Sequence, residues 1–248
     1  LRCVVVVLVL EPLLFAQEAR PYADADVLYL EANGHFNRGH YAQAIERYNA
    51  FLLKFPDHSK RVNVRYGLGL SLFQLKKYRE AGENLNIVAA KKQCPDRPRA
   101  NYFLGQSLMA TGKYAEADKV LGNGIKALSN VLTVPKDKAV FQKLEQSLKV
   151  SRLGALVHLR NWEDVVKESD DLKGKAGTHA FQVSFQGALA RYELKQFKEV
   201  LPLLSALKKD AKDTPYEQQS HFLLAEALRE LEKVPEALEE YEAAAKIR

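Results

Sequence analysis

The chain has 248 residues, of which 47% are hydrophobic, 13 are Gly and 9 are Pro, so enough apolar material is present to exclude a disordered chain. The net charge of +6 comes from 37 basic and 31 acidic residues scattered along the sequence. This pattern is typical of a mixed solvated surface and argues against a nucleic-acid-binding face. Cys3 and Cys94 form no CxxC motif, and no internal disulfide is expected.

Residues 1–16 have the pattern of a secretory signal. The segment from Val4 to Ala16 is mostly apolar, follows Arg2, and is interrupted by Glu11 and Pro12. It is shorter than the run of about 20 apolar residues that spans a bilayer, so no integral membrane span is expected in the mature chain. A basic start before a short apolar run favours export, and a buried N-terminal strand or helix is the alternative.

From residue 25 onward, one local pattern recurs six times. A small or apolar residue is followed nine positions later by a residue that is usually aromatic, and three positions after that by Ala or Val. A further residue, apolar in most copies, follows four positions later. The Ala or Val recurs at steps of 37, 36, 48, 35 and 37 residues, at Ala44, Ala81, Ala117, Val165, Val200 and Ala237.

This spacing predicts two antiparallel helices joined by a short turn. We expect the small residue to let the helices approach closely and to meet the Ala or Val of the second helix. The residue four positions later then lies one turn further along the same face. Because such a hairpin cannot bury its outer apolar face alone, neighbouring copies are expected to stack. The predicted fold is an all-α solenoid of about six antiparallel helix–turn–helix hairpins.

Several local segments resemble the tetratricopeptide repeat. They are Leu68-Gly69, Leu104-Gly105, and the sequences GHYAQA at 39–44 and GKYAEA at 112–117. Most steps lie slightly above the 34 residues of that repeat. The resemblance covers residues 25–248 and is weak in the fourth unit. It implies a right-handed superhelix whose first helices line a concave groove, and hence a non-enzymatic scaffold that binds a protein or peptide there.

The segment from Lys54 to Ala81 is also similar to tetratricopeptide proteins of bacterial cell envelopes. The similar types are outer-membrane assembly lipoproteins and Tol–Pal-associated periplasmic proteins. Together with the signal-like residues 1–16, this similarity implies an exported protein of the periplasm or cell envelope. It is also compatible with membership of a membrane-associated complex.

The pattern divides the array into three regions after the signal-like segment. Residues 25–130 hold units one to three, and residues 176–248 hold units five and six. Residues 131–175 form a lengthened fourth unit, with a long helix predicted to start near Pro135, and its irregularity predicts a hinge. No polar capping helix follows the last unit, so we expect the array to continue or to pair with a partner.

The candidate binding residues lie in the first helices, and the resemblance implies that they face the groove. Aromatic residues there can anchor an extended or helical peptide, although they can also pack against adjacent units. The candidates are Tyr29, Asn33, Phe36, Tyr66, Phe73, Tyr102, Gln106, Met109, Phe185, Tyr192, Phe222 and Arg229. Clamping of a chaperone's terminal carboxylate is not expected, because Leu70 replaces the required Asn in unit two and Tyr29 and Phe103 replace basic residues.

No motif for catalysis, metal binding or a cofactor is found. The six histidines form no HxxxH pair, and the phosphate-binding and nucleophile-elbow motifs are missing. We therefore expect no enzymatic activity and no cofactor. One alternative is the N-terminal recognition region of a larger enzyme or of a secretion or assembly component. A nucleic-acid binder that reads one base per helical repeat is disfavoured by the irregular steps and the dispersed charge.

Overall fold

The computed structural model describes residues 21–129, 138–212 and 216–247, and within these ranges it contains twelve α-helices and no strand. The signal-like residues 1–16 and Pro135 lie outside the described residues. The helices are α1 (Pro21–Asn37), α2 (Tyr41–Lys54), α3 (Arg61–Gln74), α4 (Tyr78–Ala89), α5 (Arg97–Ala110), α6 (Tyr114–Ser129), α7 (Lys138–His158), α8 (Trp162–Leu172), α9 (Ala180–Glu193), α10 (Phe197–Ala211), α11 (Glu217–Glu230) and α12 (Val234–Lys246). The predicted all-α array of six hairpins is confirmed for this part of the chain.

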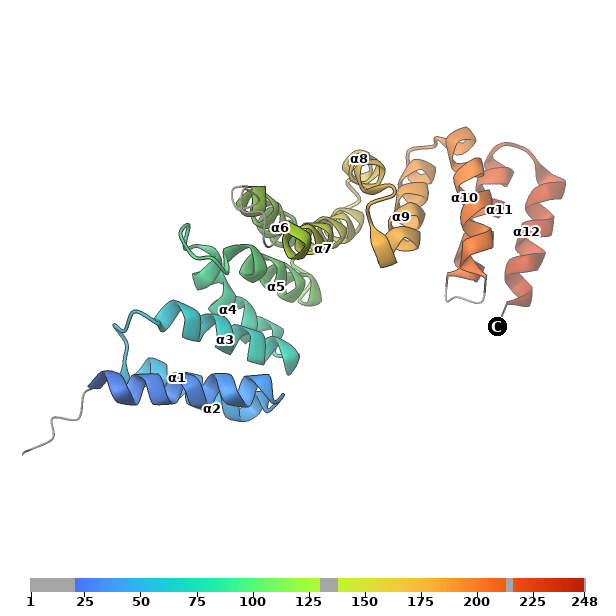
Figure 1. The fold of residues 1–248 in the computed structure, drawn as a ribbon. Coiled ribbons are helices and arrows are strands. Elements are labelled where there is room, and N and C mark those ends of the chain that lie inside the picture. Colours follow the sequence, from blue (N-terminus) through green and yellow to red (C-terminus); the bar gives the residue numbers. More distant parts are fainter. Residues whose placement is uncertain (1–20, 130–137, 213–215, 248) are drawn as a thin grey trace, which may run out of the picture.

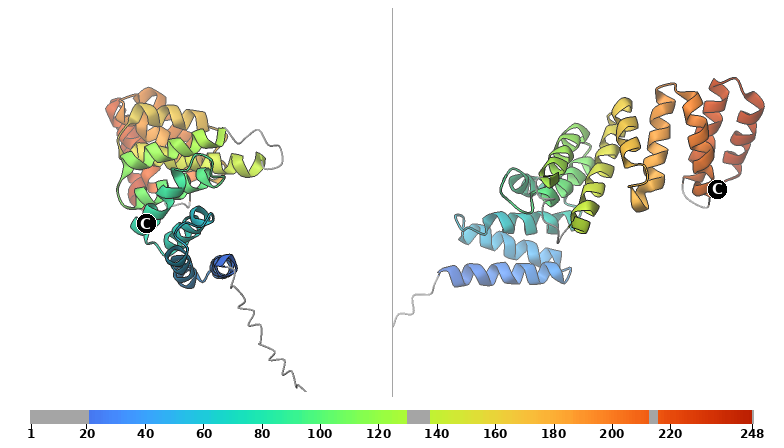
Figure 2. Two further views of the ribbon diagram at one scale, coloured as in Figure 1. Left: turned by 90° about the vertical axis from the view of Figure 1, so that its left-hand side faces the viewer. Right: turned by 45° about the horizontal axis from the view of Figure 1, so that its top comes forward.

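The hairpins stack in chain order into one elongated, curved array (Figures 1 and 2). Each helix packs against the next, from α1 through α12. Successive first helices (α1, α3, α5, α7, α9 and α11) also contact one another, whereas successive second helices have at most marginal contact over the described ranges. The first helices therefore lie on the inner, concave side of the curve, and the second helices lie on the convex side.

The turn inside each hairpin has one conformation. The residue two positions before each second helix has a positive φ, from +54° to +77°. The following backbone N–H donates to a carbonyl five residues earlier, as in the bond from His40 to His35, which satisfies the end of the first helix. Glycine occupies this position only at Gly39 and Gly112, and four hairpins place Lys76, Arg160, Lys195 and Glu232 there.

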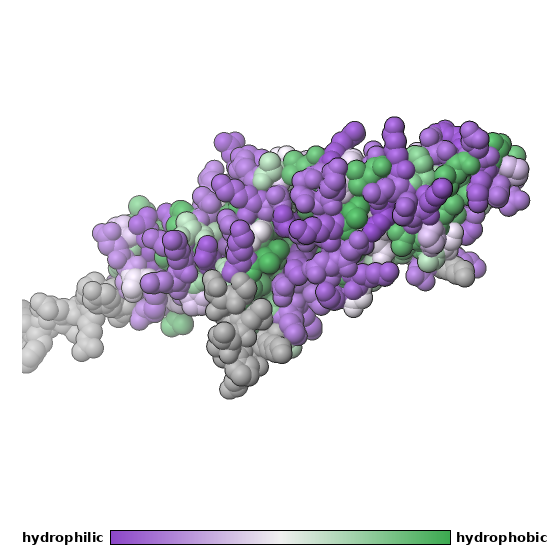
Figure 3. Space-filling view, turned by 90° about the horizontal axis from the view of Figure 1, so that it is seen from above, coloured by the Kyte–Doolittle hydropathy of each residue, from purple (hydrophilic) through white to green (hydrophobic). Residues whose placement is uncertain are grey.

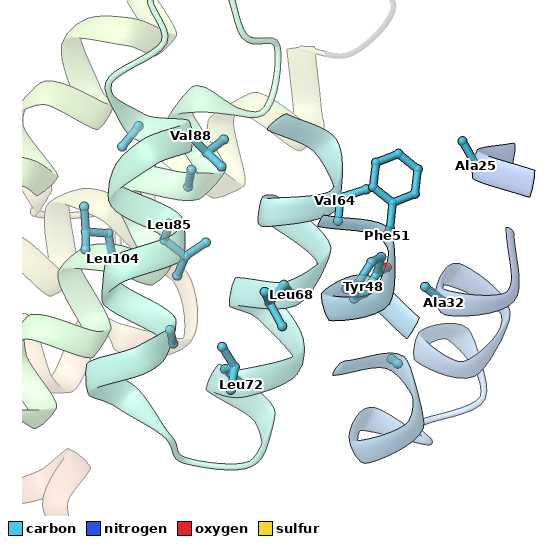
Figure 4. Close-up of a cluster of buried hydrophobic side chains, with 14 residues drawn as sticks. Ala25, Ala32, Tyr48, Phe51, Val64, Leu68, Leu72, Leu85, Val88 and Leu104 are labelled. Carbon is cyan, nitrogen blue, oxygen red and sulfur yellow. The ribbon is translucent and has the colours of Figure 1, made fainter. Parts of the chain in front are cut away.

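The core lies between the two helices of each hairpin and continues between units. The repeated Ala or Val is buried in all six hairpins. In the N-terminal units, Tyr48, Phe51, Leu68 and Leu85 point into the space between helices (Figure 4). The repeat pattern therefore marks the core.

The close approach of the two helices differs in one detail from the sequence-based expectation. The side chain nearest to Gly69 is that of Leu85, and the side chain nearest to Gly105 is that of Leu121. A Cβ atom on Gly105 would lie 2.5 Å from the Cγ and Cδ2 atoms of Leu121. The small residue therefore meets the apolar residue at the end of the pattern, rather than the Ala four positions earlier.

The fourth unit is held to its neighbours by charged side chains as well as by its core. Its first helix, α7, has 21 residues and is the longest helix of the described chain. Arg152 of α7 donates from Nε to Asp118 of α6 at 2.7 Å and from Nη1 to Glu168 of α8. Gly124 of α6 brings that helix against Leu148 of α7. The long fourth unit thus continues the stack without a break.

Candidate functional site

In the first two units, several predicted groove residues make contacts within the array. Tyr29 packs edge-on against Phe51 at a centroid distance of 6.4 Å. The hydroxyl of Tyr48 donates to Oδ1 of Asn33 at 2.6 Å. Burial raises the pKa of the Tyr66 phenol above its usual range. These side chains stabilise the packing of units one and two, whatever else they contact.

A second set of predicted groove residues packs on the turns. Phe36 lies edge-on to Tyr41 at 5.6 Å, and Phe73 lies edge-on to Tyr78 at 5.4 Å. Tyr192 makes the same contact with Phe197 at 5.5 Å. Each pair joins the end of a first helix to the start of a second helix. This recurrence explains why the sequence keeps an aromatic residue at both places.

Three predicted residues of α5 line a hollow on the concave side, which we call the central hollow. Tyr102, Gln106 and Met109 lie there with Ser151 of α7 and residues of the α9 region, around a volume of about 200 Å³. Nε2 of Gln106 donates to Oγ of Ser151 at 2.6 Å. Gly154 of α7 leaves room for Met109, because a Cβ there would lie 3.3 Å from the methionine Cε.

A larger concave depression, which we call the aromatic cleft, lies between α9, α11 and α12. Its volume is about 770 Å³. Three predicted residues line it, namely Phe185, Tyr192 and Phe222. Tyr241 of α12 and Glu226 of α11 also line it. Phe222 is 53% exposed as a residue, so this cleft presents aromatic surface to solvent.

One face of α9 connects the central hollow to the aromatic cleft. Gln182 lines the central hollow, whereas Phe185, Leu189 and Tyr192 line the aromatic cleft. These residues follow the spacing i, i+3, i+7, i+10, which places them along one helix face of about 15 Å. The two hollows therefore belong to one concave surface.

Glu226 is one of two carboxylate residues, with Glu193, that line the aromatic cleft. Its carboxylate accepts from the hydroxyl of Tyr241 and, at 3.4 Å, from that of Tyr192. Nη2 of Arg229 lies 2.8 Å from Oε2 of Glu226 and 2.9 Å from a carboxylate oxygen of Glu230. Burial and the hydrogen bond to Glu226 raise the pKa of Tyr241 to about 12. The side chain of Glu226 is only 17% exposed.

Arg229, the remaining predicted residue, is thus held beside the aromatic cleft as an internal ion partner. Sequence reasoning missed several residues of this surface, among them Gln182, Leu189, Glu226 and Tyr241. The spacing of α9 makes Gln182 and Leu189 detectable, because they lie on the face of Phe185. Tyr241 is on a second helix, where the resemblance does not predict groove residues, and Glu226 carried no pattern signal.

Two further hollows have more charged side chains in their lining than the aromatic cleft has. One lies between α4, α5 and α6, lined by Arg79, Glu83 and Lys113 among others. The other lies between α6, α7 and α8, around Arg152 and its carboxylate partners. On the face seen in Figure 3, hydrophobic residues form narrow stripes in a mostly hydrophilic surface. Several aromatic side chains together line the aromatic cleft, whereas charged side chains are prominent in these two hollows.

The described ranges give no indication of a metal site, since no group of three or more His, Cys, Asp or Glu residues there is arranged to hold an ion. Within the same ranges, no helix combines the length and apolar character needed to cross a membrane.

Comparison with known proteins identifies the repeat directly in the N-terminal units. The family model described as tetratricopeptide repeat matches residues 29–83 and 66–120. No curated protein matches the sequence.

Solved structures extend the fold likeness over most of the chain. A Podosopora anserina structure of nearly identical TPR-like repeats has a TM-score of 0.55 at 18% identity, with 76% of this chain and 95% of that chain covered. MamA of AMB-1 has a TM-score of 0.60 at 16% identity, covering 77% and 93%. Acl4, an assembly chaperone of RpL4, has a TM-score of 0.55 at 15% identity, covering 90% and 91%. At these identities the likeness shows a shared fold.

Proposed function

We propose that this array of tetratricopeptide-like repeats is a non-enzymatic scaffold that binds a protein or peptide on its concave surface. The observation that carries the proposal is the continuous face of α9, which joins the central hollow to the aromatic cleft. Stacked helical repeats create extended concave surfaces, and their first helices line them. Fold alone does not specify a function, so the proposal rests on this surface.

The surface has the features of a peptide site. Rigid aromatic rings at its C-terminal end, such as Phe185 and Phe222, offer apolar contact area at little cost in side-chain entropy. Polar groups in the central hollow, including Gln106 and Gln182, can bond to a peptide backbone. Its length of about 15 Å along α9 matches four to five extended residues at about 3.3 Å each.

Selection from a random peptide display library tests this function. Enriched peptides are synthesised, and their affinity is measured by calorimetry for the wild type and for a Met109→Ala, Phe222→Ala double variant. Because truncation of anchoring side chains removes most of their binding energy, we expect a loss of tenfold or more.

The matched control is a Leu53→Ala, Ile87→Ala double variant. Both residues are exposed hydrophobic side chains of second helices. This control is expected to bind the selected peptides with unchanged affinity. Enrichment of no peptide, or equal losses in the two double variants, would contradict binding on the concave surface.

We also propose that the protein is exported to a bacterial cell envelope. The support comes from the sequence of residues 1–16, with Arg2 before the apolar run, and from the similarity of the segment from Lys54 to Ala81 to envelope proteins. Fusion of residues 1–24 to a reporter enzyme that is active only after export tests this location. Reporter activity is the expected result, and activity equal to that of a leaderless fusion would refute it.

A further inference from the structure

The aromatic cleft combines ring faces with a carboxylate. Phe185, Tyr192, Phe222 and Tyr241 line it from three helices, and Glu226 lies among them. The described lining also contains Glu193 but no Lys, Arg or His. An aromatic face attracts a cation through its quadrupole, and a partly buried carboxylate attracts it through its charge. The cleft therefore offers both kinds of attraction to one class of group.

The charge of the last unit supports the same occupant. Residues 216–247 contain eight Glu and no Asp, against one Arg and two Lys, although the whole chain has a net charge of +6. A cationic partner is therefore steered towards this end of the array. An anionic partner would meet Glu226, Glu193 and Glu230 at the cleft, which is unfavourable.

Arg229 shows how a cation is accommodated. Its Nη2 pairs with both Glu226 and Glu230 at the edge of the cleft, while its side chain remains 53% exposed. Arg229 is therefore an internal cation that a partner's ammonium or guanidinium group can supplement or replace. The two carboxylates carry one more charge than Arg229 neutralises, and Glu193 adds to this excess.

We infer that the aromatic cleft binds a cationic side chain, Lys or Arg, of a peptide segment whose flanking residues are apolar. The aliphatic stem of the bound side chain lies on Phe185 and Phe222, and its charged end reaches Glu226, as long cationic side chains commonly do on apolar surface. This inference rests on the proposed function and specifies the chemistry of the partner.

The test uses three fluorescent decapeptides of Leu and Ala, blocked at both ends, with a central Lys, norleucine or Glu. Binding to the full chain is measured by fluorescence polarisation. We expect the Lys peptide to bind about tenfold more tightly than the norleucine peptide, and the Glu peptide to bind most weakly, because charge-assisted contacts exceed neutral ones. Rising salt concentration should reduce the preference for Lys.

Two variants locate the preference in the cleft. Glu226→Gln keeps the size of the side chain and an acceptor for Tyr241, and it should abolish the preference for Lys over norleucine. Phe222→Ala, at an exposed position, should weaken binding of the Lys peptide without affecting folding. Glu242→Gln on α12 is the matched control, because Glu242 does not line the cleft, and it should change nothing.

The Arg229→Met variant tests whether the cleft prefers a cationic or an anionic side chain. Removal of the internal cation frees Glu226 and Glu230, so the Lys peptide should bind more tightly than to the wild type. If the wild type bound the Lys peptide more weakly and the Glu peptide more tightly than the norleucine peptide, the cleft would be an anion site and the inference would be overturned. Equal affinities for the three peptides, including no binding up to about 1 mM, would also overturn it.

A failure of the cationic-cleft inference and a failure of the proposed scaffold function give different results. Library-selected peptides that require Met109 and Phe222 but show no preference for cationic residues would refute the cationic cleft and leave the scaffold function intact. Selection of no peptide on the concave surface would remove both.

Discussion

Gly69 of α3 and Leu85 of α4 are in direct contact, such that a Cβ atom on Gly69 would lie 2.7 Å from the Leu85 Cγ. This contact sets the distance between the two helices of the second hairpin. The third hairpin repeats it between Gly105 and Leu121. Larger residues at the glycine positions therefore force the hairpin apart.

Gly69→Ala should destabilise the protein by about 1–3 kcal/mol, because an added methyl group overpacks a filled core. Gly82→Ala in α4 is the matched control, since its Cβ would lie 3.6 Å from the nearest side-chain atom, at ordinary contact distance. That control should stabilise by about 0.5–1 kcal/mol, because Ala is favoured over Gly inside a helix. Urea unfolding measures both. Equal effects of the two substitutions would refute the packing role of Gly69.

Substitutions at the positive-φ positions of the turns should change stability in opposite directions, depending on whether glycine is removed or introduced. Gly112 has a φ of +76°, so Gly112→Ala should cost about 1 kcal/mol. Glu232 has a φ of +59°, and Glu232→Gly should stabilise slightly, by about 0.5 kcal/mol after the entropy loss of Gly. Thermal unfolding of both variants checks this. If Gly112→Ala left the stability unchanged, the positive φ assigned to this turn would be contradicted.

The bond between Tyr48 and Asn33 predicts a structural effect of removing one hydroxyl. Tyr48 is 1% exposed, and its hydroxyl donates to Asn33 at 2.6 Å. Tyr48→Phe should destabilise by about 1–2 kcal/mol, because the amide oxygen loses its donor in a partly buried place. Peptide affinity should not change in this variant. A loss of affinity without a loss of stability would instead assign Asn33 to partner binding.

The phenols predict a loss of stability at alkaline pH. Burial raises the pKa of Tyr48 and of Tyr66 above the usual value, and the pKa of Tyr241 is raised to about 12. The folded chain therefore retains protons that the unfolded chain releases near pH 10. This contribution to stability is complete below about pH 10 and is lost as the pH rises towards the folded pKa values.

Unfolding free energies measured across this alkaline range check the sign. A Tyr48→Phe, Tyr66→Phe variant should show a smaller decrease between neutral and alkaline pH than the wild type. An identical decrease in both proteins would show that these phenols do not contribute.

The ion pairs of Arg152 predict a local effect in the fourth unit. Arg152 is 25% exposed and pairs with Asp118 and Glu168, so Arg152→Met should cost about 1–2 kcal/mol by leaving two carboxylates without their cation. Arg79→Met is the control, because its pair with Glu83 is 3.9 Å long and largely exposed. The control should cost less than about 0.5 kcal/mol in the same urea experiment. Similar costs would contradict the linking role of Arg152.

The repeat and the six hairpins could be predicted from the sequence because the Ala or Val and its aromatic partner recur at nearly constant spacing. The lengthened helix of the fourth unit could be predicted from the one longer step of 48 residues. The spacing did not reveal that Leu85, rather than Ala81, fills the space over Gly69, because side-chain direction depends on how the helices cross. Tertiary contact, not local preference, also fixes Lys76 and Glu232 at positive φ.

The candidate site was less predictable. Phe185 and Phe222 were found from the register of the first helices, but Tyr241 comes from a second helix that reaches the same cleft. Conversely, Phe36 and Phe73 occupy the same repeat position as Tyr192, which lines the cleft, but they pack on the turns. Their roles differ because each unit leaves a different amount of space beside its neighbours, which depends on contacts between residues distant in sequence.

The most direct test of the central claim is amide hydrogen exchange of the full chain with and without a library-selected peptide. The account predicts increased protection in α5, α7, α9 and α11, with the largest change near the face of α9 from Gln182 to Tyr192. Little change is expected in α4, α6, α8 and α10. Protection confined to these second helices, with none in α9, would contradict binding on the concave surface.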